Sequence, residues 1–324
     1  MKVHSDIHNL PGFRKAVVTI GTFDGVHLGH RQIIDQLKKE ALAIGGETVV
    51  VTFHPHPRKI LPGHQPVPLI NTLAEKTELL EAQGIDHLVV VPFTPAFSSQ
   101  TAEQYVESFL IARFHPHTVI IGYDHRFGQN RLGDFHLLEK YAAAQAFKLI
   151  EIPRQLIDTV TISSTRIRTA LLEGHVTEAC RLLGYDYFFE GAVVEGNKLG
   201  RTLGYPTANL EVEEDVLVPG NGVYAVRCKL LATSYDQESA ANDSQLTARS
   251  PQLLKGMMNI GVRPTIGGVK RVIEVNLFDF NQDIYGQKLR VYIKAYLRGE
   301  QKFAGLDKLK EQLAKDKEAA LLAL

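Results

Sequence analysis

The chain has 324 residues, in which 36 lysines and arginines balance 36 aspartates and glutamates. Hydrophobic residues make up 44% and charged residues 22%, a composition typical of globular protein that excludes disorder as the main state. The zero formal net charge excludes a basic field that would draw the whole chain to nucleic acid or to an anionic membrane. At roughly 150 residues per domain, the length indicates two domains.

The two cysteines, Cys180 and Cys228, lie far apart and form no CxxC pair. They exclude a disulfide-stapled scaffold and a zinc ribbon, and they favour a reducing compartment. The start of the chain lacks the apolar core of a secretory signal, and no run reaches the ~18 apolar residues of a membrane helix. We therefore expect a cytoplasmic protein without a membrane partner.

The first half alternates short apolar runs with amphipathic stretches. The apolar runs predict strands over residues 16–21, 48–53, 87–91, 118–121 and 147–152. Helical spacing predicts helices over residues 28–44, 72–83, 102–114 and 134–146, with a proline-rich loop at 55–68. The strands are continuously apolar, which indicates that both faces of the sheet are covered. We predict an α/β domain with a doubly wound, Rossmann-like parallel sheet over residues 1–185, which binds ligands at the carboxyl ends of its strands.

The pattern changes near Gly184, after a single helix expected over residues 166–183 that bridges the two domains. The β-rich runs that follow cover residues 187–194, 222–230, 256–260, 272–280 and 288–297. Several alternate with period two, which predicts an all-β antiparallel barrel or sandwich over residues 186–324. The polar stretch 233–250 is expected to be an exposed hairpin loop. A terminal amphipathic helix is expected to bury one face, formed by Phe303, Leu306, Leu309 and Leu313.

The first strand is followed by the turn GTFDGVHLGH, residues 21–30, which opens a helix. A helix start favours anions, because its free N–H groups and its dipole face the ligand. His27 and His30 are three residues apart and project from one face, and Gly29 allows a nucleotide to approach the backbone closely. A pair of solvated or capping histidines is the alternative. The strand–turn–helix context favours phosphate chemistry.

A second anion element is ISSTRIR, residues 162–168, which opens another helix. Ser163, Ser164 or Thr165 can cap that helix, and Arg166 or Arg168 can bind phosphate. An ordinary N-cap with solvated arginines is the alternative. The HxH pairs at residues 54–56 and 115–117 lack partner ligands and are not expected to bind a transition metal.

The informative run in the second half is GRTLGYPTAN, residues 200–209. Its glycines permit close backbone approach, and Thr207 and Asn209 offer hard oxygen ligands suited to Mg²⁺ shared with ATP phosphates. A plain hairpin is the alternative. The chain contains no GxxxxGK[ST] sequence, so it is not a P-loop enzyme.

Taken together, these motifs resemble a known family from about Val17 to about Ala320. The runs GTFDGVHLGH, FHPHPR (53–58), GYDHRFG (122–128) and ISSTRIR resemble an adenylyltransferase module. The runs GRTLGYPTAN, GVYA (222–225), NIGVRPT (259–265) and EVNLF (274–278) resemble a riboflavin kinase module. The sequence resembles the prokaryotic bifunctional riboflavin kinase/FAD synthetases.

The resemblance implies roles for individual residues. In the first module His27 and His30 would be catalytic. The residues expected to bind ATP phosphates there are Gly21, Phe23, Asp24, Gly29, His56, Ser163, Ser164, Thr165 and Arg168. Those expected toward the flavin are Asp124, His125 and Phe127, with His125 standing where the family often has Phe. In the second module the resemblance implies ATP binding by Gly200, Arg201 and Gly204, Mg²⁺ ligation by Thr207 and Asn209, Glu274 as general base, and flavin contacts from Arg298 and Phe303.

The resemblance implies two reactions with ATP as co-substrate: phosphorylation of riboflavin to FMN, and adenylylation of FMN to FAD with release of pyrophosphate. One alternative is a related nucleotidyltransferase that acts on another phosphorylated substrate. A second alternative is a non-catalytic flavin sensor. A class I aminoacyl-tRNA synthetase is a third, but the KMSKS loop is missing. The sequence does not indicate an oligomeric state.

Overall fold

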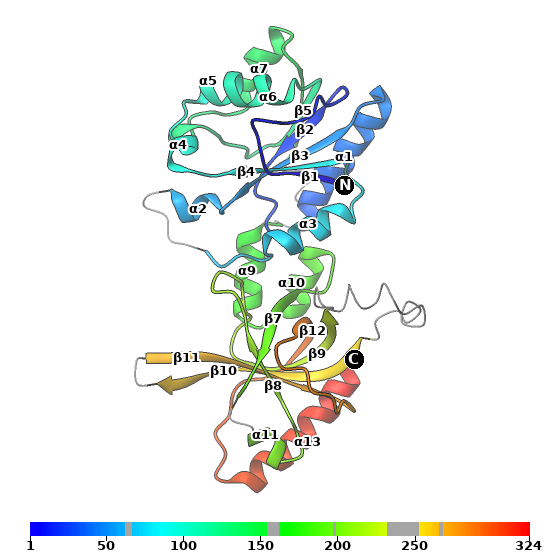
Figure 1. Ribbon diagram of the computed structural model, residues 1–324, viewed down its shortest axis with the longest axis vertical. Coiled ribbons are helices and arrows are strands. Elements are labelled where there is room, and N and C mark those ends of the chain that lie inside the picture. The colour runs from blue at the N-terminus through cyan, green and yellow to red at the C-terminus, as the bar shows by residue number, and fades with distance from the viewer. Residues whose placement is uncertain (62–66, 154–161, 197–198, 232–252, 266–267) are drawn as a thin grey trace. The chain divides into compact units, whose positions relative to one another are not determined.

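The computed structural model describes residues 1–61, 67–153, 162–196, 199–231, 253–265 and 268–324. The chain divides into two compact units, Met1–Ser164 and Thr165–Leu324 (Figure 1). The expected hairpin loop at 233–250 lies outside the described residues. No described helix combines the length and the apolar character needed to cross a membrane.

The first unit is built on a six-stranded sheet in the order β1-β4-β3-β2-β5-β6, in which all neighbours are parallel. The five predicted strands are confirmed, because their apolar runs need cover on both faces. The additional edge strand β1 was not predicted, since it is short and only one of its residues is apolar. The strands are β1 (Lys2–His4), β2 (Val17–Ile20), β3 (Thr48–His54), β4 (His87–Pro92), β5 (Thr118–Gly122) and β6 (Lys148–Ile152).

Successive side chains of each strand enter two different cores. Val50 packs with helices α1 (Leu28–Ile44) and α3 (Leu73–Glu81), whereas Val49 and Val51 pack on the opposite face. That opposite face is covered by segments between β4 and β5 and between β5 and β6. They are α5 (Ala102–Gln104), a π-helix (Tyr105–Ile111), α6 (Ala112–Phe114) and α7 (Phe135–Ala143). The sheet is therefore doubly wound, as predicted. The described part of this unit also contains the short helices α2 (Pro57–Ile60) and α4 (Pro95–Ser98) and a 3₁₀-helix (Gln129–Arg131).

The single helix expected over 166–183 is wrong. The structure has two helices, α9 (Ser164–Leu172) and α10 (Val176–Leu183). Gly174 lies between them with φ +79°, a left-handed conformation that glycine adopts freely and that ends α9. The division between the units falls at the start of α9, so most of α9 and all of α10 belong to the second unit.

The second unit is a closed antiparallel barrel in the order β10-β11-β8-β7-β12-β9. The barrel alternative of the sequence analysis is thereby confirmed. Strand β8 has four residues and was not predicted, and the run expected at 272–280 ends at Leu277. The barrel strands are β7 (Phe188–Val194), β8 (Ala208–Glu211), β9 (Gly222–Leu231), β10 (Leu254–Thr265), β11 (Gly268–Leu277) and β12 (Lys288–Arg298).

Among the residues that the structure describes after Gly184, the helices are α11 (Leu199–Thr202) and the terminal α13 (Leu306–Ala323). The terminal helix is confirmed, but its expected buried face is wrong for Leu306, which is 55% exposed. The helix buries Asp316 and Ala320, and Leu313 of the expected face packs against the same hydrophobic cluster as Ala320. Asp316 accepts hydrogen bonds from Arg298 Nε at 2.8 Å and Arg298 Nη2 at 2.6 Å. An ion pair therefore holds this helix in addition to its apolar contacts.

Candidate active sites

The first candidate site lies at the carboxyl ends of β2 and β5, which are neighbours in the sheet. The connection that leaves β2 runs through α1 on one face, and the connection that leaves β5 runs through α7 on the other. The strand order therefore reverses between β2 and β5. Open α/β sheets bind ligands at such a switch point. The turn at residues 21–27 and the loop at residues 123–128 both begin there.

Two stacked imidazoles stand at the start of α1. The ring centroids of His27 and His30 are 3.6 Å apart with an interplanar angle of 11°. His27 is the N-cap, and its Nδ1 accepts the backbone N–H of His30 at 3.3 Å. Burial, the neighbouring His27 and the charge of Lys76 hold the pKa of His30 well below its usual value, so this ring is neutral at pH 7. The capping alternative is thus correct for His27, and it leaves His27 Nε2 on the far edge of the ring.

Asp24 lies beneath the turn and is 1% exposed. Its Oδ1 accepts the backbone N–H groups of Ile70 at 3.0 Å and Asn71 at 3.4 Å. Its backbone carbonyl accepts the Ser164 hydroxyl at 2.9 Å. Asp24 therefore joins three segments of the first unit. This placement suits a carboxylate that organises the turn, and the phosphate-site role expected for Asp24 stays a prediction.

The other predicted residues of the turn expose almost no side chain at its surface, and their phosphate contacts stay predictions. The Phe23 ring is 2% exposed and belongs to the core under α1. Its backbone has φ +47°, and a Cβ added to Gly21 would lie 3.2 Å from the Phe23 ring. Gly29 is buried within the first turn of α1. A phosphate at this turn would thus meet N–H groups and imidazoles rather than the Phe23 side chain.

Lys76 was not predicted as a site residue, although it is only 6% exposed. Its Nζ donates to the carbonyl oxygen of Thr22 at 2.8 Å and lies 3.5 Å from Thr52 Oγ1. Burial lowers the pKa of Lys76, and the charge of Asp24 opposes that change. The only sequence signal is a lysine in the first turn of α3, where basic residues oppose the helix dipole.

The remaining phosphate residues start two other helices. His56 is the N-cap of α2, and its Nδ1 accepts the Arg58 N–H at 3.2 Å. Ser163 and Ser164 end the first unit. Thr165 and Arg168 belong to the second unit, where Thr165 is exposed and Arg168 is buried. The phosphate contacts expected of these residues stay predictions.

The loop expected toward the flavin begins after β5. Asp124 is exposed, whereas Phe127 is 5% exposed and stacks on Tyr105 with ring centroids 4.8 Å apart. Burial, with a smaller contribution from the charge of Arg131, lowers the pKa of His125 to about 4. His125 Nε2 is buried, and no hydrogen-bond partner for it occurs in the described part of the chain. Flavin contacts from this loop stay a prediction.

The second candidate site is a row of polar residues across three strands of the barrel. Asn209 of β8 is the register partner of Glu274 of β11, and Glu274 is the partner of Asn259 of β10. Directly opposed residues of antiparallel strands project from the same face. Glu300 reaches this face as well, where Gly261 leaves room for its carboxylate. Glu274 is half-buried at the centre of this row.

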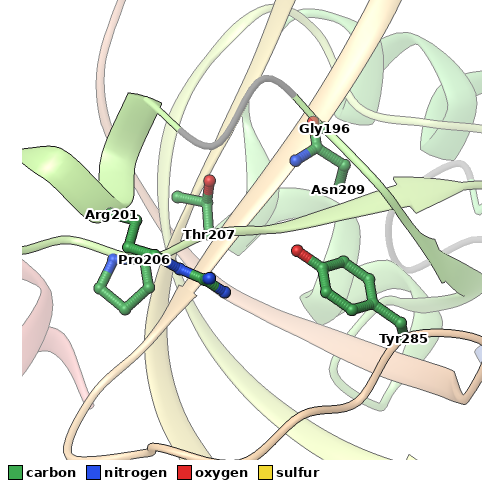
Figure 2. Close-up of a pocket in the computed structure, with 6 residues that line it drawn as sticks. All are labelled: Gly196, Arg201, Pro206, Thr207, Asn209 and Tyr285. Carbon is green, nitrogen blue, oxygen red and sulfur yellow. The ribbon is translucent and has the colours of Figure 1, made fainter.

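A pocket lies beside this row. It is lined by Gly196, Arg201, Pro206, Thr207, Asn209 and Tyr285. Figure 2 shows Thr207, Asn209 and the Tyr285 hydroxyl turned toward the same space, with the Arg201 side chain beside it. Tyr285 and Gly196 were not predicted, because neither lies in a motif with a chemical signature. Gly196 is needed here, since a Cβ on it would lie 2.0 Å from Asn209 Nδ2.

The two glycines that were predicted at this site shape its loop. A Cβ on Gly200 would lie 2.3 Å from the Tyr205 carbonyl oxygen, and Gly204 has φ +83°. Arg298 is held by Asp316, and its Cζ lies 5.9 Å from the centroid of the half-buried Phe303 ring. Asn276 Nδ2 donates to the Pro206 carbonyl at 2.6 Å. The loop is thus anchored to β11, and flavin contacts from Arg298 and Phe303 stay predictions.

Comparisons with known proteins match the two units separately and the chain as a whole. The FAD synthetase family model matches residues 11–166, and the riboflavin kinase family model matches residues 183–324. The bifunctional riboflavin kinase/FMN adenylyltransferase of Escherichia coli K12 is 35% identical over 318 residues, which cover 98% of this chain and 96% of that protein. The protein of the same name from Haemophilus influenzae is 37% identical over 305 residues, or 94% and 92% of the two chains.

A crystal structure titled as a macrolide-efflux protein from Streptococcus pneumoniae is similar over 98% of both chains, with 32% identity and a TM-score of 0.84. The fold is therefore shared along almost the whole length. The two family models, the near-complete coverage of the relatives and the two sites lead to one conclusion. The chain belongs to the family of bifunctional riboflavin kinases/FMN adenylyltransferases.

Proposed function

We propose that residues 1–185 transfer an adenylyl group from ATP to FMN and that residues 186–324 phosphorylate riboflavin with a second ATP. The family carries both activities, with the FAD synthetase part before the riboflavin kinase part. The observation that supports this division best is that each unit holds its own polar site. Another nucleotidyltransferase would not account for the riboflavin kinase domain in the same chain. A non-catalytic flavin sensor would not need His27, His30 and Glu274, which are all present.

In the first site, a phosphate oxygen of FMN attacks the α-phosphorus of ATP and pyrophosphate leaves. Negative charge builds on the phosphate oxygens, so donors that are already in position lower the barrier. Because His27 Nδ1 accepts a backbone N–H, Nε2 is the nitrogen of this ring that carries a proton. That N–H and the start of α1 are suited to donate to an α- or β-phosphate oxygen. His30 stacks on His27 and holds its plane.

In the second site, the 5′-hydroxyl of riboflavin attacks the γ-phosphorus of ATP and ADP leaves. Glu274 is proposed as the general base that accepts the hydroxyl proton. Asn209 and Glu274 are register partners, so the base lies next to the residue proposed to bind the nucleotide's metal. Arg201 lines the same pocket and can neutralise phosphate charge.

Thr207 and Asn209 are the residues that would hold Mg²⁺. A hydroxyl and an amide oxygen are hard ligands of the kind Mg²⁺ prefers, and Gly196 leaves the Asn209 amide the room that a Cβ would fill. When bound, the metal supplies neutralisation of the ATP phosphates. The Thr207 hydroxyl and the Asn209 amide then fix where those phosphates lie relative to Glu274.

The proposal makes riboflavin, FMN, FAD and ATP the binding partners and assigns no nucleic acid partner. It places the enzyme in the cytoplasm, where ATP is plentiful and where Cys180 and Cys228 stay reduced thiols. The test is a chromatographic time course with riboflavin, ATP and Mg²⁺. FMN should appear first and FAD should follow. FMN without FAD would contradict the function proposed for the first unit, and neither product with flavin still bound would favour the sensor.

A further inference from the structure

The buried Lys76 is the group in the first unit that the reaction as described leaves without a role. Its ammonium makes two hydrogen bonds, to the Thr22 carbonyl and to the Thr52 hydroxyl, and it forms no ion pair with any described residue. Taking an ammonium out of water is costly unless a charge of opposite sign compensates it. The buried Asp24 carboxylate supplies part of that compensation, but burial still lowers the pKa of the ammonium. An anion bound at the turn above would supply the rest.

Lys76 also determines the direction of a peptide bond in the phosphate turn. The Thr22 carbonyl oxygen accepts from Lys76 Nζ at 2.8 Å and from Thr52 Oγ1 at 3.1 Å. In a trans peptide the carbonyl and the N–H of one plane point in opposite directions. The Phe23 N–H therefore points away from Lys76, and it has no recorded acceptor among the residues that the structure describes. Lys76 leaves a donor available at the turn.

The helix that carries Lys76 is tied to the same turn by a second set of bonds. The Asp24 carboxylate accepts the N–H groups of Ile70 and Asn71, directly before the N-cap Thr72 of α3. Thr72 and Glu75 form a reciprocal capping box that fixes the first turn of this helix. The start of α3 is thus fixed by Asp24, and the Lys76 ammonium is fixed by Thr22. Together these contacts hold Lys76 beneath residues 21–24.

We propose that Lys76 is a positioning residue for adenylyl transfer, whose buried charge and hydrogen bond to Thr22 prepare the turn for the ATP phosphates. This inference rests on the function proposed for the first unit. The ligand class is a nucleoside triphosphate, since a polyanion is what a cation beneath a turn with backbone N–H donors and two imidazoles would bind. The effect should appear in ATP binding more than in turnover.

Lys76→Gln separates the charge from the hydrogen bond, because the amide can still donate to Thr22. In the full-length protein, the KM for ATP in FAD formation from supplied FMN should rise about tenfold, the size expected when a charged hydrogen-bonding group is replaced by a neutral one. The kcat should change less. FMN formation by the second unit of the same chain should stay at the wild-type rate, which serves as an internal control.

Lys38→Gln is the matched control. Lys38 is an exposed lysine of α1 that also donates to a backbone carbonyl, that of Gln83 at 2.9 Å. It should leave both activities unchanged. An ATP KM for Lys76→Gln within about twofold of the wild-type value would overturn the proposal, because it would show that the buried charge contributes nothing to binding. Equal losses in the Lys76 and Lys38 variants would overturn it as well.

A nuclear magnetic resonance titration of the histidines gives a readout independent of activity. His30 faces the His27 ring and the Lys76 ammonium, and both lower its pKa. The charge of Asp24 in turn raises the pKa of Lys76. In Lys76→Gln the pKa of His30 should move up toward its usual value, and an unchanged pKa counts against the proposal. If Lys76→Gln unfolds the first unit, the Lys76→Arg variant tests the proposal in its place. A folded arginine variant that still binds ATP supports the role of the charge, and a folded one that does not overturns it.

A wild-type enzyme that forms no FAD at all would instead refute the function proposed for the first unit. In that case the failure would appear before any variant is made. Failure of the Lys76 inference alone would leave wild-type FAD synthesis intact, so the two results are distinguishable.

Discussion

Replacing Asp316 with asparagine should destabilise α13 strongly, although the substitution preserves the volume of the side chain. Asp316 accepts two hydrogen bonds from Arg298 and a third from Gln312 Nε2 at 2.9 Å. The side chains of Asp316 and Arg298 are 4% and 17% exposed. Asparagine removes the charge and turns an N–H₂ group toward the guanidinium, which leaves Arg298 largely buried without a counter-charge.

Breaking a buried ion pair from one side costs about 3–5 kcal/mol. Because Arg298 retains some contact with water, the lower end applies, and we expect about 3 kcal/mol. That loss of local stability makes the amide protons of α13 exchange about a hundredfold faster, provided that the helix recloses faster than its open form exchanges. The increase should be confined to peptides from α13 and from the end of β12.

Hydrogen exchange followed by mass spectrometry is the suitable assay, because the chain has no tryptophan and two units that need not unfold together. Glu311→Gln is the matched control on the same helix. Glu311 pairs with Lys308 on the surface, where the two side chains are 58% and 67% exposed. It should give no measurable change. Equal protection in Asp316→Asn and wild type would refute the reasoning that this ion pair holds α13.

Three further predictions concern the two sites. Glu274→Gln should abolish FMN formation, because the proton acceptor is lost, while FAD formation from supplied FMN persists; equal loss of both activities would rule out separate sites. His30→Ala should do the reverse in the same chromatographic assay, and retained FAD synthesis would remove His30 from the site. Because burial lowers the pKa of His125 to about 4, the stability of the first unit should be full above pH 6.5 and fall as the pH drops toward 4. His125→Phe should flatten that fall in thermal unfolding, and an unchanged slope would exclude His125 as its origin.

The sequence predicted the central strands well because a parallel strand that is buried on both faces needs a mainly apolar run. It failed for β1 and β8, which have three and four residues and too few apolar positions to show a period. The split between α9 and α10 depends on one left-handed glycine, Gly174, within an otherwise helical pattern. These errors concern short elements and boundaries, where local signals are weakest.

The site chemistry was predictable only in part. The spacing of His27 and His30 placed them on one face, and the structure stacks them. The roles of Lys76 and Asp316 could not be predicted, since each depends on a partner in another segment of the chain, Thr22 and Arg298, that periodicity does not reveal. The same holds for the pairing of Asn209 with Glu274, which requires β8 to lie beside β11.

That pairing makes the riboflavin kinase site sensitive to strand register. Side chains of a strand alternate between its two faces, so a slip of one residue between β8 and β11 would turn Glu274 toward the barrel interior and put Ile273 or Val275 beside Asn209. The only described pairs between these strands are Glu274 with Asn209 and Val275 with Ala208. A barrel closed in the wrong register could therefore keep its secondary structure and still lose phosphorylation. Riboflavin kinase activity is then a more exacting measure of correct folding in this unit than circular dichroism.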